Sequence, residues 1–204
     1  MNGEEKMYYW LRDIREPLIR PIVKVLAFFR VHPSALSFAG VFLMLGFIYF
    51  VGTNPLMSFY FLLAALAMDA FDGGLARYLK VDSDKGKFTD VLVDNLNFTL
   101  FIIGLTAVSL VSGAAGAAYV YFMLLARVLM VVRKNLGRVS DWLIRPMAGA
   151  FPNVLAYLSY AIFTVYVFTG ADYLNITSML FAAFLATKAL IDFLLLGRLH
   201  TQSS

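Results

Sequence analysis

The 204-residue sequence contains no cysteine and only two histidines, His32 and His200. Disulfide bonds and thiolate chemistry are therefore excluded, and a histidine-rich metal site would have too few ligands. Charged residues are also scarce, at 15% of the chain, whereas 61% of the residues are hydrophobic. Soluble globular domains have roughly half their residues apolar, and no polar segment here is long enough to form a separate soluble domain. The composition therefore indicates an integral membrane protein.

Several apolar runs reach the length of about 18 residues that a membrane-spanning helix needs. We expect six such helices, at Ser34–Val51, Leu56–Tyr78, Gly86–Val111, Ala115–Val132, Pro152–Phe168 and Ile176–Leu196. The predicted fold class is an all-α integral membrane protein with six transmembrane helices. The predicted organisation is an amphipathic juxtamembrane segment at 1–33 followed by a six-helix transmembrane domain at 34–204.

The segment before the first span is amphipathic rather than uniformly apolar. Between Met7 and Arg30, leucine, isoleucine and valine alternate with arginine and lysine. We expect one or two helices that lie in the membrane interface, with their basic side toward the lipid headgroups. Within His32-Pro33-Ser34, which follows, Ser34 is the expected N-cap of the first span.

Positive charge is missing from three connections between the expected spans, at 52–55, 112–116 and 169–175. With six spans, fifteen of the 17 basic residues fall on the opposite side. The positive-inside rule then places that side, with both termini, in the cytoplasm.

Two basic residues fall inside expected spans. Lys188 is followed four residues later by Asp192, so we expect a structural ion pair on one helix face. Arg127 lies within two turns of the basic end of its span, from which its side chain can extend toward the interface.

Two stripes of acidic and small residues occupy the helices that flank the connection 79–85. The first has the spacing i, i+3, i+4, i+7 and consists of Asp69, Asp72, Gly73 and Ala76. The second has the spacing i, i+4, i+8 and consists of Gly86, Asp90 and Asp94. Each spacing places its residues on one face of a helix. Because a short connection joins the helices in a hairpin, the two stripes can face each other near the cytoplasmic side.

Four carboxylates gathered in a membrane repel one another, and each charge costs about 2.5–3.5 kcal/mol at the centre of a helix. Divalent cations offset this cost, and hard oxygen ligands select Mg²⁺, Mn²⁺ or Ca²⁺ rather than zinc. Gly73 and Ala76 leave a concavity, and Arg77 offers a fork of donors that suits phosphate. The combination indicates chemistry on a diphosphate, in which one carboxylate takes a proton from an incoming hydroxyl.

The whole pattern resembles the signature of the CDP-alcohol phosphotransferase family. It runs Asp69-x-x-Asp72-Gly73-x-x-Ala76-Arg77, then eight residues, then Gly86-x-x-x-Asp90-x-x-x-Asp94, and it meets every fixed position over 26 residues. The chain length, the six spans and the basic N-terminal segment are also similar. The stretch His32-Pro33-Ser34-Ala35-Leu36-Ser37 resembles the Thr-Pro-Asn-x-x-Thr that opens the first span in many members, with serine in place of asparagine.

The resemblance implies a metal-dependent transferase of phospholipid synthesis, with 34–204 as its catalytic domain. Asp69, Asp72, Asp90 and Asp94 would bind one or two Mg²⁺ or Mn²⁺ ions, and Asp94 would also be the general base. The CDP group would be bound by Asp69, Gly73, Ala76, Arg77 and Gly86. The acceptor hydroxyl would attack the phosphorus attached to the lipid and release CMP. Members are usually homodimers, so we expect a homodimer in the inner (cytoplasmic) cell membrane, with the active site facing the cytoplasm and no nucleic-acid partner.

The resemblance does not identify the acceptor alcohol, because members use glycerol phosphate, inositol phosphate, inositol, serine, choline or ethanolamine. A second basic group, suited to a phosphorylated acceptor, consists of Arg133, Lys134, Arg138, Arg145 and Arg198. The positive-inside rule alone also predicts arginines here. Inositol phosphate is slightly favoured over glycerol phosphate, although "PMAGAF" after Arg145 lacks a second arginine expected of a close inositol-phosphate relative. The lipid donor could be CDP-diacylglycerol or an archaeal ether analogue.

Two other classes of protein also carry acidic residues in membranes. A membrane prenyltransferase handles a magnesium diphosphate but needs two acidic motifs far apart in a longer chain. A divalent-cation transporter needs polar residues at the midplane of several spans. Here the acids fall in one hairpin, and apart from Lys188 and Asp192 the charges stay at one face. Both classes remain alternatives, which assays of CMP release and of ion flux in liposomes separate.

Overall fold

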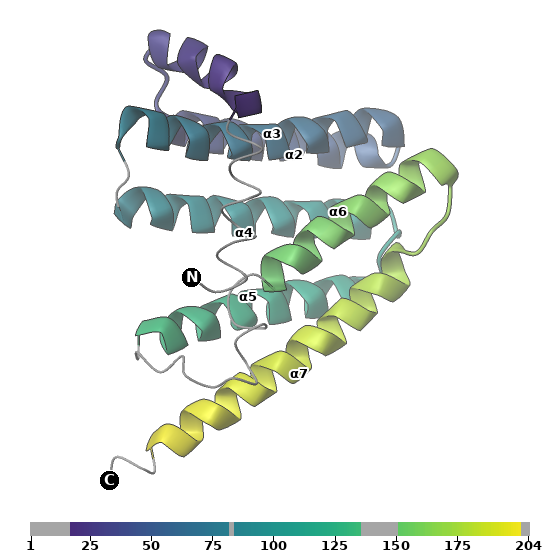
Figure 1. Ribbon diagram of the computed structural model, residues 1–204. Coiled ribbons are helices and arrows are strands. Elements are labelled where there is room, and N and C mark those ends of the chain that lie inside the picture. Colours follow the sequence, from purple (N-terminus) through teal and green to yellow (C-terminus); the bar gives the residue numbers. More distant parts are fainter. Residues whose placement is uncertain (1–16, 82–83, 136–150, 201–204) are drawn as a thin grey trace. The chain divides into compact units, whose positions relative to one another are not determined.

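The structure is a computed structural model that describes residues 17–81, 84–135 and 151–200. Side chains are described in these ranges except at 84–88, 90, 130–131, 133–135, 151 and 195–200. The regular secondary structure of the described part is entirely α-helical (Figure 1). A helix at residues 17–28 is followed by α2 (Pro33–Val51), α3 (Pro55–Leu79), α4 (Asp84–Ala107), α5 (Gly113–Asn135), α6 (Phe151–Thr169) and α7 (Leu174–His200).

Each expected span coincides with one helix, which confirms the all-α fold class. The end of α4 differs from the prediction by four residues, because α4 stops at Ala107 rather than at Val111. It stops because Ser109 adopts a positive φ of 62°, and the N–H of Leu110 turns back to the carbonyl of Leu105 at 3.0 Å. This pattern is typical of a helix C-terminus.

Among the described residues, α2, α3, α6 and α7 are long and apolar enough to cross a membrane. The segments of α4 and α5 with described side chains that are apolar span Val91–Ala107 and Gly113–Leu129. The chain is therefore a multi-pass membrane protein, whereas the total of six spans stays a prediction.

The chain divides into two compact units, Met1–Phe101 and Ile102–Ser204, so the boundary lies inside α4. The predicted division at residue 33, between an interfacial segment and a transmembrane domain, stays a prediction. The two units are described separately below.

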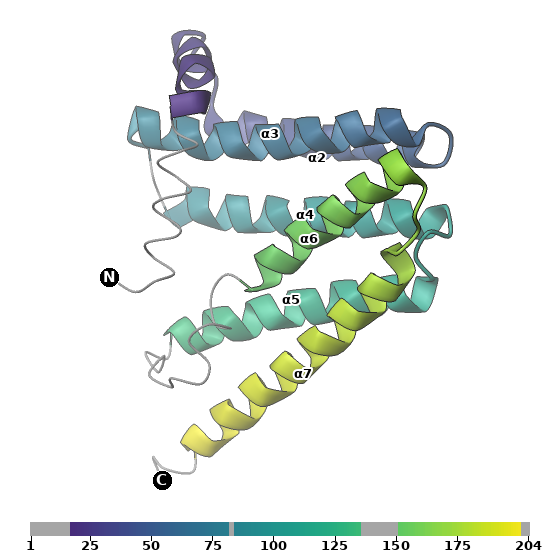
Figure 2. The same cartoon turned by 45° about the vertical axis from the view of Figure 1, so that its right-hand side comes forward.

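In the first unit α2 and α3 lie side by side along their length (Figures 1 and 2). The absence of a side chain at Gly46 allows close approach, since a Cβ there would lie 2.5 Å from Phe61 Cε1. The Phe61 ring stacks on Phe50, with centroids 5.4 Å apart. Phe47, fully buried, contacts Phe101 of α4 with ring centroids at 5.3 Å. Small residues at such interfaces let membrane helices pack closely.

The helix at 17–28 packs on the C-terminal part of α3 (Figure 2). Its Val23 is buried in a cluster with Leu36 of α2 and Leu75 of α3. The contact passes over Gly74, where a Cβ would lie only 2.7 Å from Ile19 Cδ1. A glycine at position 74 therefore lets this helix lie directly against α3.

The helix at 17–28 and α3 end in the same way, with a basic residue in the left-handed conformation. Arg30 has φ 53° and Lys80 has φ 55°. The N–H of Val81 donates to the carbonyl of Ala76 at 3.1 Å, and the N–H of Lys80 to that of Arg77 at 3.2 Å. These are the paired bonds of a Schellman motif. Both motifs place positive charge at the negative end of a helix dipole.

In the second unit, α5 packs against α7 and α6. The buried Tyr119 hydroxyl of α5 lies 3.2 Å from the carbonyl oxygen of Leu155 and 2.9 Å from Ser159 Oγ, both in α6. Within α7, Lys188 Nζ donates to Asp192 Oδ2 at 2.5 Å, and both side chains are buried. The ion pair predicted from their spacing is confirmed.

Candidate active site

The first acidic stripe lies on one helix, as predicted, because all of its members fall within α3. Asp69 is partly buried, and Asp72 is only 5% exposed. The hydroxyl of Ser37 in α2, itself 3% exposed, donates to Asp72 Oδ2 at 2.6 Å. A buried carboxylate needs such donors to stay charged. Ser37 therefore orients Asp72 across the contact between α2 and α3.

The first turn of α2 shows that the predicted N-cap is wrong, and it contains a further residue, Ser37, that contacts the acidic stripe. The N-cap is His32, whose Nδ1 accepts the N–H of Ser34 at 3.3 Å, and not Ser34 as expected. Pro33 occupies the first helical position, which suits its fixed φ. Ser37, the last residue of the stretch that resembles the family's opening motif, was not singled out, yet it is the residue of that stretch that contacts the acidic stripe.

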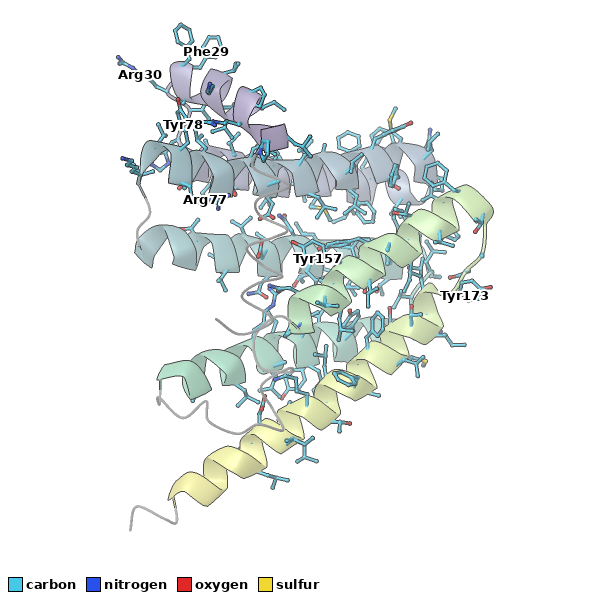
Figure 3. All side chains as sticks on the ribbon, viewed as in Figure 1. Phe29, Arg30, Arg77, Tyr78, Tyr157 and Tyr173 are labelled. Carbon is cyan, nitrogen blue, oxygen red and sulfur yellow. The ribbon has the colours of Figure 1, made fainter. Side chains whose placement is uncertain are left out.

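Arg77 lies between this stripe and a cavity. Its Nη1 is 3.4 Å from the position that a Cβ would take on Gly73, so the guanidinium lies over that glycine. The structure thus brings Gly73 and Arg77 together, and CDP binding by these residues stays a prediction. The cavity, of about 570 Å³, lies between α3 and the helix at 17–28 and is lined by Pro17, Ile19, Arg20, Val23, Gly74, Arg77 and Tyr78. Figure 3 labels Arg77 and Tyr78 on α3.

The second stripe is also on one helix, since Gly86, Asp90 and Asp94 all fall within α4. Asp94 is partly buried. The side chain of Asp90 and the surroundings of Gly86 lie outside the described part of the structure.

A contact one helical turn from Asp94 shows which way its face of α4 points. Asn97 Nδ2 lies 3.6 Å from the position of a Cβ on Gly40 in α2. Asn97 is three residues after Asp94, and Gly40 is three residues after Ser37, so each pair shares a helix face. The face of α4 that carries Asp94 is therefore turned toward the face of α2 whose Ser37 binds Asp72. The approach of Asn97 to Gly40 was not predicted from the sequence.

The donor chemistry of this region suits a divalent cation. Asp69, Asp72 and Asp94 supply hard carboxylate oxygens, which Mg²⁺ and Mn²⁺ prefer. A hydrogen bond such as that from Ser37 to Asp72 is the kind of outer contact that orients a metal ligand. Among the described side chains, no three acidic or histidine groups are close enough to hold a metal ion by themselves. Asp90, the remaining predicted ligand, lies outside that set.

The predicted acceptor-phosphate residues are largely beyond what the structure describes. Arg133 and Lys134 fall in the last turn of α5, and Arg198 in the last turn of α7, without described side chains. Arg138 and Arg145 lie outside the described residues. A phosphate pocket formed by these five residues stays a prediction.

Arg127 of α5 contacts a neighbouring helix. Its Nη2 donates to Asn153 Oδ1 of α6 at 2.8 Å. This residue therefore connects α5 to α6 within the second unit, and its expected extension toward the interface stays a prediction.

Comparison with known proteins gives one family and one relative. Residues 30–190 match the family described as CDP-alcohol phosphatidyltransferase. This range includes both acidic stripes and Ser37. An uncharacterized protein of Aquifex aeolicus (strain VF5) is 32% identical over 91 residues. The aligned part covers 44% of this chain and 46% of the relative, so the match spans less than half the length of that curated relative.

Proposed function

This chain belongs to the CDP-alcohol phosphatidyltransferase family, a family of phosphate-group transferases, and we propose that it transfers a phosphatidyl-type group from a CDP-lipid to the hydroxyl of a small polar alcohol. The observation that carries the proposal is the position of each acidic stripe relative to α2. Asp72 is held by Ser37 of α2, and the α4 face of Asp94 turns to the same side of α2. We propose that the two acidic stripes thereby face each other.

In the proposed reaction the alcohol oxygen forms a bond to the phosphorus that carries the lipid. The bond between that phosphorus and the bridging oxygen of the diphosphate breaks, and CMP leaves with the electron pair. Asp94 takes the proton of the attacking hydroxyl. Asp69, Asp72 and Asp90, with Asp94, would hold one or two Mg²⁺ or Mn²⁺ ions, which when bound neutralise the diphosphate oxygens.

The nucleotide end of the donor is assigned to Asp69, Gly73, Ala76, Arg77 and Gly86. The small residues leave room for the cytidine, and Arg77 donates to the phosphates. The position of the Arg77 guanidinium over Gly73 supports this assignment.

The acceptor is proposed to be inositol phosphate, with glycerol phosphate next. Arg133, Lys134, Arg138, Arg145 and Arg198 would bind its phosphate. The protein is proposed to be a homodimer in the inner cell membrane, with its active site facing the cytoplasm.

The direct test supplies purified protein with CDP-diacylglycerol, Mg²⁺ or Mn²⁺, and a panel of alcohols, and measures the release of CMP. We expect release that depends on one alcohol and stops reversibly when a chelator removes the metal. Liposomes that contain the protein should show no divalent-cation flux. Ion flux, with no CMP released whichever alcohol is supplied, would contradict this proposal and indicate a transporter.

A further inference from the structure

Asn97 of α4 carries an amide oxygen whose hydrogen bonding is incomplete. Its Oδ1 is buried and accepts no hydrogen bond from any residue in the described part of the chain. The residue as a whole is only partly buried. A buried acceptor without a donor costs free energy, and such a group in a native protein typically obtains its partner from water, an ion or a ligand. Asn97 is therefore a candidate for contact with a bound molecule.

The surroundings of Gly40 place Asn97 one helical turn beyond the acidic residues. A Cβ on Gly40 would lie 3.6 Å from Asn97 Nδ2 and 3.6 Å from the carbonyl oxygen of Ala65 in α3. Ala65 precedes Asp69 by four residues, and Asn97 follows Asp94 by three. Each spacing is about one turn along one helix face. Asn97 therefore lies next to the acidic residues of both stripes, on the side away from the turn that joins α3 and α4.

The components of the proposed reaction differ in how close they come to Asn97. The cytidine is assigned to Gly73 and Ala76, which follow the acidic residues of α3 in the direction away from Asn97. The cations are assigned to the carboxylates themselves. The attacking hydroxyl of the acceptor is assigned to Asp94, which is the acid of α4 one turn from Asn97. The acceptor alcohol is therefore the component placed best to donate a hydrogen bond to this amide.

Asp94 and Asn97 are spaced to hold two neighbouring groups of one small molecule. Residues at i and i+3 of a helix have Cβ atoms about 5–6 Å apart. The last torsion of an asparagine side chain has only a broad preference, so the oxygen can turn toward a donor. We infer that Asn97 binds the acceptor, by accepting a hydrogen bond from a second O–H or N–H group beside the hydroxyl that Asp94 deprotonates; this inference rests on the proposed function.

This role restricts the class of acceptor. Polyols such as inositol phosphate and glycerol phosphate, and amino alcohols such as serine and ethanolamine, carry a donor near the attacking hydroxyl. Choline carries a quaternary ammonium group, which has no N–H to donate. We therefore expect the acceptor to be a polyol or an amino alcohol with a free N–H group, and choline to be a poor substrate.

A matched pair of variants separates acceptor binding from a structural role. Asn97→Leu keeps the branched shape of the side chain and removes the amide. Asn95→Leu makes the same change two residues away, where the amide nitrogen donates to the carbonyl of Val91 in the same helix at 2.8 Å. The measurement is CMP release by the purified proteins with CDP-diacylglycerol and Mn²⁺, against the concentration of inositol phosphate, glycerol phosphate, serine, ethanolamine or choline. The Mn²⁺ dependence and the thermal midpoint of each protein are measured as well.

We expect Asn97→Leu to raise the KM of the acceptor by about three- to tenfold, the effect of losing one neutral hydrogen bond. The KM of CDP-diacylglycerol and the Mn²⁺ dependence should be unchanged. The thermal midpoint should not fall, because replacing a buried acceptor that has no donor removes an unfavourable group. The smaller variant Asn97→Ala should raise the acceptor KM in the same way, whereas Asn95→Leu should leave it unchanged.

The inference is overturned if choline is the best acceptor, or if Asn97→Leu leaves the KM of the acceptor unchanged. A shift in the Mn²⁺ dependence instead of the acceptor KM would assign Asn97 to the metal ions. A lower thermal midpoint with an unchanged acceptor KM would assign it to packing alone. If the parent protein releases no CMP with any of the five alcohols, the proposed function itself fails.

Discussion

At the scale of a residue, the fold fixes the orientation of the Asp72 carboxylate. Its side chain is almost completely buried in an apolar helix pair, and Ser37 donates a short hydrogen bond to one of its oxygens. The bond fixes the direction of the other oxygen as well, because the carboxylate is planar. Residues that hold a metal ligand in this way typically change metal affinity by about 10- to 100-fold when they are replaced.

Ser37→Ala should therefore raise the Mn²⁺ concentration that gives half-maximal CMP release by about tenfold. The maximal rate at saturating Mn²⁺ should fall much less, since Asp72 itself remains. Ser34→Ala removes the same atom one helical turn away and serves as the control. Equal metal dependence of the two variants would show that the Ser37 hydroxyl does not orient a ligand.

Asp94→Asn tests the proposed general base. An amide has nearly the shape of the carboxylate but cannot accept the proton of the alcohol, so turnover should be abolished. Binding of the CDP-lipid should be largely retained, which titration of the purified variant can measure. Turnover close to that of the parent protein would remove Asp94 from this role.

The sequence indicated the acidic residues but not the residues that support them. Asp69, Asp72 and Asp94 are recognisable because their spacing places several charges on one face of an apolar helix. Ser37 is a single hydroxyl in an apolar run, and its partner is 35 residues away. Gly40 and Asn97 likewise become informative only when α2 and α4 are placed together.

At the scale of an element, the contact between α2 and α3 depends on Gly46. An alanine Cβ there would lie within 2.5 Å of the Phe61 ring, which stacks on Phe50. Gly46→Ala should lower the free energy of unfolding by about 1–3 kcal/mol, the usual cost of overpacking. The thermal midpoint of the detergent-solubilised protein measures the effect. Gly113→Ala, where nothing lies within 4 Å, should leave that midpoint nearly unchanged.

The buried ion pair of α7 gives a second prediction for an element. Lys188→Met removes the positive partner of Asp192 and should cost about 3–5 kcal/mol, because a buried carboxylate loses its counter-charge. The double variant with Lys188→Met and Asp192→Leu should recover most of the loss, since no buried charge remains at the pair. Thermal midpoints of the three proteins provide the comparison. A double variant no more stable than the single one would show that the pair contributes more than mutual neutralisation.

The helices themselves were predictable, because long apolar runs bounded by prolines, glycines and charges leave few alternatives. The residues at which the helices begin and end were harder to predict. The end of α4 depends on the backbone conformation of Ser109, and the start of α2 on the ring nitrogen of His32. Neither serine at a positive φ nor histidine at an N-cap is among the preferred residues for these positions.

At the scale of the whole molecule, the distribution of positive charge predicts the direction in which the chain crosses the membrane. The sequence lacks cysteine, so single cysteines can be labelled without background. Thr53→Cys, in the turn between α2 and α3, and Ala114→Cys, at the exposed start of α5, should react with a membrane-impermeant maleimide in intact cells. Val81→Cys, 51% exposed beside Lys80, should react only after permeabilisation. The opposite pattern of labelling would invert the proposed orientation.

Neither the number of membrane spans nor the acceptor alcohol follows from composition alone. Among the described side chains, α4 and α5 have apolar segments at Val91–Ala107 and Gly113–Leu129, and the first of these includes Asp94 of the second acidic stripe. The identity of the acceptor depends on arginines that the positive-inside rule would place there in any case.

The paired helix ends at Arg30 and Lys80 have a consequence for membranes of different thickness. Arg30 is followed almost at once by the start of α2, and Lys80 follows the end of α3, so both charged turns lie at the same end of this helix pair. In the proposed orientation the headgroup layer holds that end at a fixed depth. A thicker or thinner bilayer must then be accommodated at the opposite end, around the uncharged turn of Gly52 and Thr53. The cavity beside α3 and the acidic faces would keep their depth while the far side of the protein adjusts.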